Sequence, residues 1–368
     1  MNIKTVITHE QNIEKAMEDL KKQLETFNPK LVIYFASSIY SPQELSDKMQ
    51  SGFTQAQTFG CSTSGELISG TITKNSIVLM ALNDKIISDA KIEVIENLSE
   101  LDQVKSAFVS FENYYKAKLN ELDLDKYVGL ILIDGLRGKE ERIMEKIGAL
   151  TNLTFVGGSA GDDLKFSQTY VFANGKSYTN AAILILLKTN NGFDILKTQS
   201  FNPLNKILKV TKANEAKREV MEFNNNPAIV EYAIALGKST EEAKNSFMHN
   251  PIGLMIDGQP YVRSPQQAKD NSMVFYCNMS EGMELSLLEG TDIVNDTKKA
   301  IAAKELELGK ITGIINFHCI LRTLGLEDSN KSDEYGKIFT AIPTIGFSTY
   351  GEQYIGHMNQ TSTMLLFK

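Results

Sequence analysis

Three glycine-containing segments carry the residues whose types and spacing best suit chemistry. They are Gly60–Glu66, Gly157–Asp162 and Gly346–Glu352; each follows an apolar residue, continues through a serine and ends on an acid. Glycine lets the backbone turn tightly and leaves amide N–H groups open to a ligand, and the hydroxyl and carboxylate groups add further partners. One such segment alone could equally be an ordinary turn. Their recurrence strengthens the interpretation that they are equivalent loops able to hold a small molecule.

Cys61 is the one thiol in these segments and a candidate nucleophile. Backbone N–H groups could lower its pKa. However, no histidine lies near it in the sequence, and the equivalent positions of the other two segments hold Gly158 and Phe347. A thiol that is not shared by the three segments is better explained as a small buried residue or a ligand contact than as a catalytic group. The sequence therefore predicts a protein that is not an enzyme.

The acids that end the segments, Glu66, Asp162 and Glu352, have two interpretations. They can cap backbone N–H groups, or one of them can hold the ammonium group of a ligand. Arg322, which follows a buried apolar stretch, likewise pairs either with an internal carboxylate or with the carboxylate of a ligand. An arginine, a glutamate and several hydroxyl groups together are what a zwitterionic amino acid requires.

The histidines are His9, His249, His318 and His357, and no two of them have the spacing of metal ligands. We therefore predict no metal site. His318, beside Cys319, is the best candidate for a haem ligand, although a histidine within a strand is more often a core residue.

The elements that must position these groups form a repeated unit. An apolar strand at 31–36, a helix from Ser41, the Gly60 segment and a strand at 76–82 make the first copy. Leu31 precedes Gly60 by the same number of positions as Val128 precedes Gly157, and a stretched third copy begins at Gly313. The pattern predicts an α/β fold of mixed sheets covered by helices, in which a βα–glycine loop–β unit occurs three times. Gly60, Gly157 and Gly346 are expected at or just after a strand end, in matching surroundings.

Composition limits the class of protein. The chain has 368 residues, a net charge of −7 and three cysteines far apart in the sequence. We predict two domains, 1–198 and 199–368, the second opening with helices over 214–223 and 227–236. The charge and the lack of a basic run argue against nucleic acid as a partner. No apolar run is long enough to insert into a membrane, and the sparse cysteines fit the cytoplasm.

Several motifs in this order resemble the FIST family, a sensory module with N-terminal and C-terminal domains. The N-terminal motifs are 59–66 and 156–163, and the C-terminal motifs are 261–265, 317–322, 346–352 and 357–361. The resemblance implies small-ligand binding, with amino acids suggested, and a signal passed to a histidine kinase, a cyclic-dinucleotide enzyme or a chemoreceptor. It also implies that some relatives are haem-dependent nitric oxide sensors.

Carried onto this chain, the resemblance and the residue chemistry predict a set of ligand-binding residues: Cys61, Ser62, Thr63, Ser64, Gly65, Glu66, Gly158, Ser159, Asp162, Arg263, Cys319, Arg322, Thr349, Tyr350, Glu352 and Asn359. We expect the first and third loops to face one cleft, with Arg322 near it. The predicted function is small-ligand sensing by a stand-alone module without a cofactor that signals to a separate protein. The alternatives are a haem-based nitric oxide sensor with His318 as ligand and, less favoured, a hydrolase that uses a loop serine or cysteine.

Overall fold

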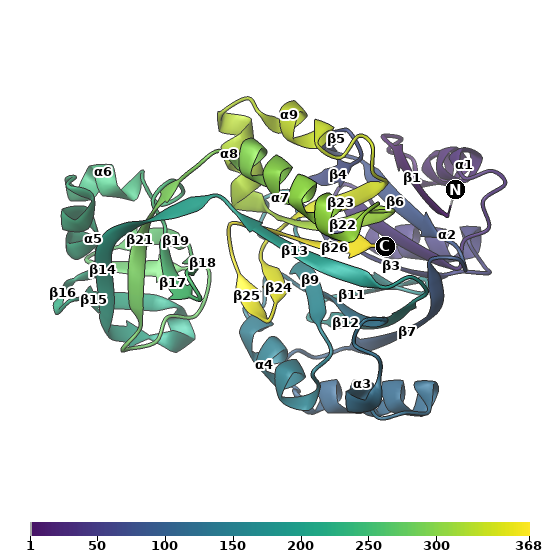
Figure 1. Cartoon of the computed structure of the whole chain (residues 1–368), viewed down its shortest axis with the longest axis horizontal. Coiled ribbons are helices and arrows are strands. Elements are labelled where there is room, and N and C mark those ends of the chain that lie inside the picture. Colours follow the sequence, from purple (N-terminus) through teal and green to yellow (C-terminus); the bar gives the residue numbers. More distant parts are fainter. Residues whose placement is uncertain (1) are drawn as a thin grey trace. The chain divides into compact units, whose positions relative to one another are not determined.

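The computed structural model describes residues 2–368, and these form two compact units (Figure 1). The first unit contains the chain up to Lys197 together with Thr297–His357 and Ser362–Lys368, and the second contains Thr198–Asp296 and Met358–Thr361. The division near Lys197 lies beside the expected boundary at 198. The rest differs from two contiguous domains, because the chain returns to the first unit after Asp296.

The first unit consists of three copies of one pattern: strand, helix, strand, helix, strand, short hairpin, strand. The first copy comprises β1 (Ile3–Thr8), α1 (Ile13–Gln23), β2 (Leu31–Ser37), α2 (Pro42–Gly52), β3 (Gln57–Thr63), β4 (Glu66–Ile68), β5 (Thr71–Thr73) and β6 (Ile77–Leu82). The second comprises β7 (Ile87–Ile95), α3 (Asp102–Tyr115), β8 (Tyr127–Ile133), α4 (Glu140–Leu150), β9 (Phe155–Ser159), β10 (Val171–Ala173), β11 (Lys176–Tyr178) and β12 (Ala182–Thr189).

The third copy is interrupted after its first strand by the second unit. It comprises β13 (Phe193–Gln199), α7 (Ile293–Leu308), β22 (Gly313–Cys319), α8 (Ile320–Asp328), α9 (Ser332–Lys337), β23 (Thr344–Thr349), β24 (Glu352–Tyr354), β25 (Gly356–Met358) and β26 (Thr361–Phe367). The predicted triplication is therefore confirmed, and the repeat is longer than the sequence indicated because it includes an outer strand and its helix.

The three copies exchange their hairpins. Each builds a six-stranded sheet with the same strand order, and the last two strands come from another copy: β1-β6-β2-β3-β10-β11, β7-β12-β8-β9-β24-β25 and β13-β26-β22-β23-β4-β5. The hairpin of the first copy thus completes the sheet of the third, that of the third completes the second, and that of the second completes the first. Consequently no copy can complete its sheet alone.

The inner faces of the three sheets share one hydrophobic core. It contains buried residues of all three copies, and near its centre the Phe347 ring lies 4.6 Å from the Phe35 ring and 6.0 Å from the Phe317 ring, measured between centroids. Helices α1 and α2 cover the outer face of the first sheet, and α3 and α4 cover that of the second. In the third copy α8 packs against β22 and β23.

Each copy contains a glycine where two parallel strands approach closely. Gly60, Gly157 and Gly346 pair in register with residues 34, 131 and 316 of the preceding parallel strand. A Cβ added at these glycines would lie 1.8, 1.8 and 2.2 Å from the carbonyl oxygen of the paired residue. The predicted matching surroundings are confirmed. The glycines lie within the strands rather than at their ends, because strand pairing continues through the hydroxyl residues that follow them.

The second unit is mainly an antiparallel sheet. Its strands are β14 (Phe201–Asn214), β15 (Glu219–Phe223), β16 (Asn226–Pro227), β17 (Ile252–Ile256), β18 (Gln259–Arg263), β19 (Pro265–Lys269), β20 (Ser272–Phe275) and β21 (Glu284–Gly290), with the helices α5 (Ala228–Leu236) and α6 (Thr240–Lys244). The helix expected over 227–236 is confirmed as α5. The one expected over 214–223 is wrong: this stretch holds good helix formers, but β15 pairs with β14 and buries Val220 and Phe223.

We predict that Gly60→Ala, Gly157→Ala and Gly346→Ala each destabilise the protein by about 1–3 kcal/mol or more, because each added methyl group would displace a parallel strand. Gly148→Ala is the control, since Gly148 is exposed in α4 with no atom near the added Cβ. It should be neutral or stabilise by about 0.5–1 kcal/mol. Urea unfolding of the four variants measures this, and equal stabilities would contradict the close-approach role.

Candidate functional site

The three glycine segments meet at one place and bond directly to one another through their backbones. The connecting hydrogen bonds run from Gly161 N to Ser62 O (2.9 Å), from Ser159 N to Gly351 O (2.8 Å) and from Ser348 N to Gly65 O (2.8 Å). The first and third loops are therefore in direct backbone contact with each other and with the second loop. The cleft that the first and third loops were expected to face stays a prediction. We call this the loop junction.

Several hydroxyl and amide groups that were predicted to bind a ligand form hydrogen bonds within the loop junction. Ser62 Oγ donates to Gly161 O at 2.7 Å and accepts from Tyr170 N at 2.9 Å. Thr349 Oγ1 donates to Ser159 O and Gly351 O at 2.9 and 2.7 Å. These bonds hold the three copies together, so these hydroxyl and amide groups have a structural role in this arrangement.

Cys61 faces the shared core. Burial raises the pKa of its thiol well above the usual value, so the thiol stays protonated. At the equivalent position of the second copy, a Cβ on Gly158 would lie 2.9 Å from the Phe347 ring and 3.0 Å from Thr349 Oγ1. Cysteine, glycine and phenylalanine thus fill the centre of the core with side chains of complementary size. A nucleophilic thiolate has no support here.

Glu66 is fully buried. Its Oε2 accepts from Ser76 Oγ at 2.7 Å and Ser76 N at 3.2 Å, and its Oε1 accepts from Thr63 Oγ1. Burial raises the pKa of this carboxyl to about 8, against the hydrogen bonds that lower it. The group is therefore mostly neutral at pH 7, and it does not provide the negative charge that a ligand ammonium would need.

The three terminal acids are not equivalent in the structure. Glu66 pairs across the strands with Phe347, and Glu352, also fully buried, pairs with Gly158. At the matching register of the second copy stands Val171, opposite Cys61. Asp162 lies instead in the longer connection between β9 and β10. The similarity of the three segments in sequence did not reveal this difference, because residue types in a loop do not define strand register.

Asp162 stabilises this longer connection. Its Oδ1 accepts from Tyr350 OH at 2.6 Å and its Oδ2 from Ser167 N at 2.6 Å. Burial raises its pKa, but these bonds outweigh burial and the net direction is downward. The Phe166 ring also stacks on Tyr350, with centroids 5.3 Å apart. The capping interpretation accounts for Asp162, and the Ser64 backbone N–H, which donates to Ser348 O at 3.3 Å, likewise serves the loop junction.

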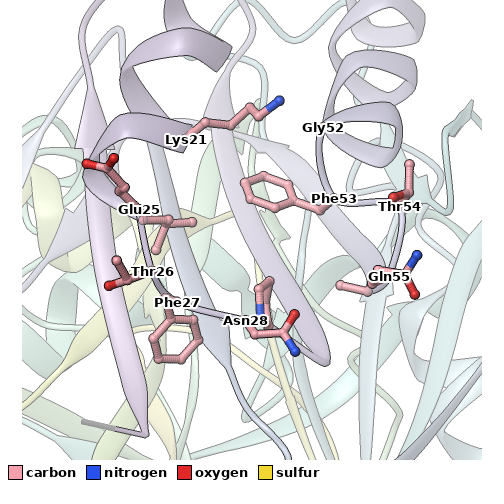
Figure 2. Close-up of a pocket in the computed structure, with 12 residues that line it drawn as sticks. Lys21, Glu25, Thr26, Phe27, Asn28, Gly52, Phe53, Thr54 and Gln55 are labelled. Carbon is pink, nitrogen blue, oxygen red and sulfur yellow. The ribbon is translucent and has the colours of Figure 1, made fainter.

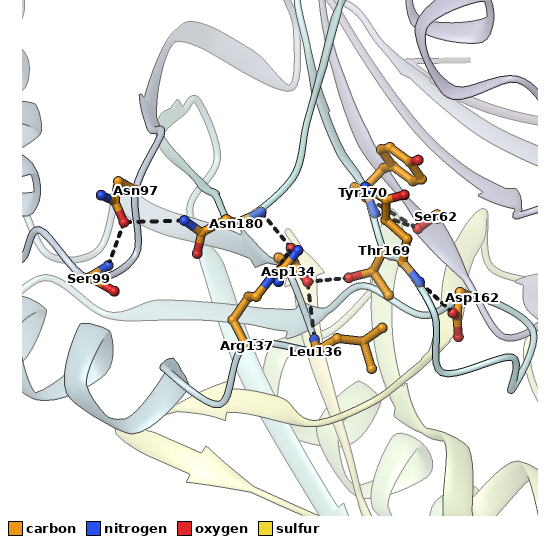
Figure 3. Close-up of polar contacts among 11 residues, drawn as sticks. Ser62, Asn97, Ser99, Asp134, Leu136, Arg137, Asp162, Thr169, Tyr170 and Asn180 are labelled. Carbon is orange, nitrogen blue, oxygen red and sulfur yellow. Dashed lines mark hydrogen bonds and ion pairs between the residues drawn. The ribbon is translucent and has the colours of Figure 1, made fainter.

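Asp134, which directly follows β8, holds the same connection from the other side (Figure 3). It accepts from Thr169 Oγ1 at 2.5 Å, Asn180 N at 2.6 Å, Leu136 N at 3.1 Å and Arg137 Nε at 3.0 Å. Its two oxygens are thus shared among four donors, and it acts as a structural centre between β8 and β12.

Arg322 lies in the first turn of α8, directly after β22 and its last residue Cys319. It is 1% exposed, and its Nη2 donates to Thr297 Oγ1 at 3.0 Å. The next residue, Thr323, shares a 2.8 Å hydrogen bond between its Oγ1 and Ser348 Oγ. Helix α8 is therefore connected to the third loop one residue away from the buried guanidinium.

His318 lies on the helix-facing side of β22. Its Nδ1 is 3.0 Å from Tyr335 OH, and the two rings lie 4.7 Å apart. Its Nε2 is buried and has no hydrogen-bond partner among the described residues. Burial, and then the charge of Arg322, lower the pKa of the imidazole well below its usual value, so the ring is neutral. The sequence analysis did not identify Tyr335 or Ser362, the residue that pairs with His318 between β22 and β26.

The surroundings of His318 do not fit a haem in this arrangement. The imidazole is packed against Tyr335, which in turn packs on Phe339 at 5.5 Å. A porphyrin would require a wide slot beside His318 Nε2, whereas the charged guanidinium of Arg322 lies near this imidazole. Among residues 2–368, moreover, no group of three His, Cys, Asp or Glu side chains could hold a metal ion.

Two of the predicted ligand-binding residues belong to the second unit. Arg263 ends β18 and pairs with Ile252. Asn359 is 1% exposed, and its neighbour Gln360 donates from Nε2 to Ser264 Oγ at 3.0 Å. The ligand-binding role of these two residues stays a prediction.

A surface hollow of about 300 Å³ lies elsewhere on the first unit (Figure 2). It is lined by the last turn of α1, which holds Lys21, and by the segments that follow α1 and α2, which hold Phe27 and Phe53. It adjoins a second hollow of about 540 Å³. Both hollows lie near the residues that precede β2 and β3, whereas the loop junction follows the opposite ends of these strands.

We predict that the stability of the wild type falls between about pH 4.5 and pH 8. In this window the folded state keeps a proton on Glu66 that the unfolded state, with the ordinary pKa of 4.5, has lost. The loss should total on the order of 3–5 kcal/mol. Glu66→Gln keeps the shape of the side chain but has no titratable carboxyl group, so its unfolding free energy should lack this pH-dependent contribution. Urea unfolding at several pH values measures it, and parallel pH curves for the two proteins would refute it.

Comparison with known proteins identifies the family of this chain. Residues 30–226 match the FIST N domain and residues 228–355 match the FIST C domain. An uncharacterized protein of Methanocaldococcus jannaschii is 23% identical over 291 residues, which cover 73% of this chain and 56% of that protein. The chain thus spans little more than half the length of this relative. Because the two family matches together cover most of the sequence, this protein belongs to the FIST family.

Proposed function

We propose that this protein is a small-ligand sensor of signal transduction and that Arg322 binds the carboxylate of its ligand. Membership of the FIST family supports the general role, since these domains are associated with small-ligand sensing. An amino acid or a similar small carboxylate is the class of ligand that the chemistry of a guanidinium favours.

The observation that carries this proposal is the position of Arg322. A guanidinium that is 1% exposed lies just after the carboxyl end of β22, which runs parallel to β23. Ligands of α/β folds bind preferentially at this end of parallel strands. A fully buried charge is expensive to maintain, and function is a common reason for keeping one. The fork of donors on arginine matches a carboxylate in two-pronged geometry.

The route from ligand to signal starts at α8. A ligand bound at Arg322 acts on the first turn of this helix, and the Thr323–Ser348 hydrogen bond connects that turn to the loop junction. A small displacement of α8 would therefore also displace the loop junction. The signal then passes to a separate protein, for which a histidine kinase, a cyclic-dinucleotide enzyme or a chemoreceptor is our proposal. No helix among residues 2–368 is long and apolar enough to cross a membrane.

We expect free amino acids or other small carboxylates, screened one by one, to raise the melting temperature of the wild type. A ligand at 100 times its dissociation constant stabilises the folded state by about 2.7 kcal/mol. Arg322→Ala should abolish this shift, because a lost buried charged hydrogen bond costs about 2–5 kcal/mol. Arg322→Lys should restore little, since an ammonium lacks the fork.

Arg137→Ala is the matched control, because Arg137 pairs with Asp134 and its side chain is 41% exposed. This variant should keep the ligand-induced shift. If a folded Arg322→Ala protein has a lower melting temperature but the same ligand-induced shift, Arg322 is a structural residue and the proposed anchor is wrong.

The two other candidate functions receive less support. A hydrolase would need a free nucleophile, whereas the Cys61 thiol is protonated in the core and the Ser62 hydroxyl is bonded within the loop junction. A haem sensor would need a slot at His318. The absorbance of the purified protein tests this second alternative, because bound haem would give an intense Soret band.

A further inference from the structure

The threefold repeat supplies an internal comparison for the layer between each sheet and its helices. Residues at three matching positions of this layer are Tyr34, Ala36 and Ile77 in the first copy, Ile131, Ile133 and Ala182 in the second, and Asn316, His318 and Ser362 in the third. The first two sets belong to hydrophobic clusters. Only in the third copy do a carboxamide, an imidazole and a hydroxyl occupy these positions.

This polar layer is not required by the fold. The second copy forms the same contact with apolar side chains alone, and the first has a single polar atom there, the Tyr34 hydroxyl. Burying polar groups costs free energy unless every one of them is hydrogen-bonded. Here one group, His318 Nε2, is buried and unpartnered among the described residues. A polar layer that is unnecessary for folding and incomplete in its hydrogen bonds points to a bound molecule.

The hydrogen bonds around His318 define the role of this nitrogen. Ser362 Oγ donates to Asn316 Oδ1 at 2.7 Å, Asn316 Nδ2 donates to Tyr335 OH at 3.4 Å, and Tyr335 OH donates to Ser362 Oγ at 3.3 Å. The single proton of the Tyr335 hydroxyl is then used on Ser362. We assign the 3.0 Å contact with His318 to a hydrogen bond donated by Nδ1–H of the imidazole, which leaves the Tyr335 proton on Ser362. In the neutral ring Nε2 consequently carries a lone pair and accepts a hydrogen bond.

We propose that His318 Nε2 accepts a hydrogen bond from a hydroxyl group of the ligand whose carboxylate binds Arg322, so that the ligand is a small hydroxycarboxylate. This rests on the proposed function and narrows its ligand class. Both side chains are about 1% exposed. Entry of the ligand therefore requires α8 and α9 to move away from β22, which couples binding to a conformational change.

A hydroxyl group fits this position better than an ammonium group. Arg322 lies close enough to lower the pKa of His318, that is, to disfavour a positive charge on the ring. An ammonium group at Nε2 would meet the same repulsion. Glu66 does not compensate, because it is mostly protonated at pH 7 and is bonded to Ser76 and Thr63. A neutral donor avoids this repulsion.

The test uses three acids that share a three-carbon frame and differ at the second carbon: propionate, racemic lactate and racemic alanine. Calorimetric titration of the wild type should show lactate binding at least about tenfold more tightly than propionate, the size of one well-formed buried hydrogen bond. Alanine should bind more weakly than lactate. His318→Ile, which introduces the residue of the second copy, should reduce lactate to the level of propionate and leave propionate unchanged.

His357→Gln is the matched control, because His357 is a buried histidine of the same copy whose Nδ1 is already 3.3 Å from Gln353 Nε2. It should retain the preference for lactate. Equal binding of lactate and propionate to the wild type would overturn the role of His318 and leave the proposed function intact. Tighter binding of alanine than of lactate would overturn the choice of a hydroxyl group.

A second variant tests the layer without depending on a carboxylate ligand. It carries Asn316→Ile, His318→Ile and Ser362→Ala, the residues of the second copy, together with Tyr335→Phe. We expect this variant to fold with a melting temperature no lower than that of the wild type and to lose lactate binding. A lower melting temperature would show that the polar layer is structural and would overturn the inference. If no carboxylate binds the wild type, the proposed function fails and the ligand class inferred here fails with it.

Discussion

The exchange of hairpins among the three copies is the constraint on which the rest of the structure depends. Each sheet is completed by two short strands from another copy, and the exchange closes into a cycle. Apolar burial alone would permit three separate sheets, whereas the exchanged hairpins also pair the backbone groups of β3, β9 and β23. Because every copy supplies the edge of another, the loops that lead into the hairpins are forced together. The hairpin exchange alone therefore explains why the loops meet at the loop junction, without a binding or catalytic role for them.

The same symmetry separates structural from functional polar groups. Where the three copies agree, as at the close-approach glycines, the fold explains the residue. Where one copy departs from the others, the fold gives no reason, and the buried Arg322 and the polar layer of His318 are the clearest departures. Groups that looked most like a binding site, such as Ser62, Thr349 and Asp162, turn out to hold backbone segments together.

The sequence predicted the repeated unit because glycine, where two backbones nearly touch, cannot be replaced by a residue with a Cβ. It did not predict the hairpin exchange, since a hairpin of three-residue strands has the same sequence pattern whichever sheet it joins. The helix expected over 214–223 failed because pairing with β14 overrode local propensity. The division of the chain was missed for a similar reason: a strand such as β22 carries no mark of the distant segments against which it packs.

Site prediction from sequence was correspondingly partial. The first and third loops were expected to face one cleft, and the structure brings them into contact together with the second loop. That the loops bond to one another through their amide groups depends on three-dimensional contacts and could not be predicted. Arg322 was recognised from its chemistry after an apolar strand. The importance of Tyr335 and Ser362 was not, because a tyrosine and a serine acquire meaning only when a buried imidazole lies within hydrogen-bond distance.

A crystal structure of the protein grown with lactate would test the central claim most directly. We expect the ligand carboxylate within hydrogen-bond distance of the Arg322 guanidinium, its hydroxyl within hydrogen-bond distance of His318 Nε2, and α8 displaced relative to β22. Density for lactate at another site, with only a water molecule bound to His318 Nε2, would contradict the account.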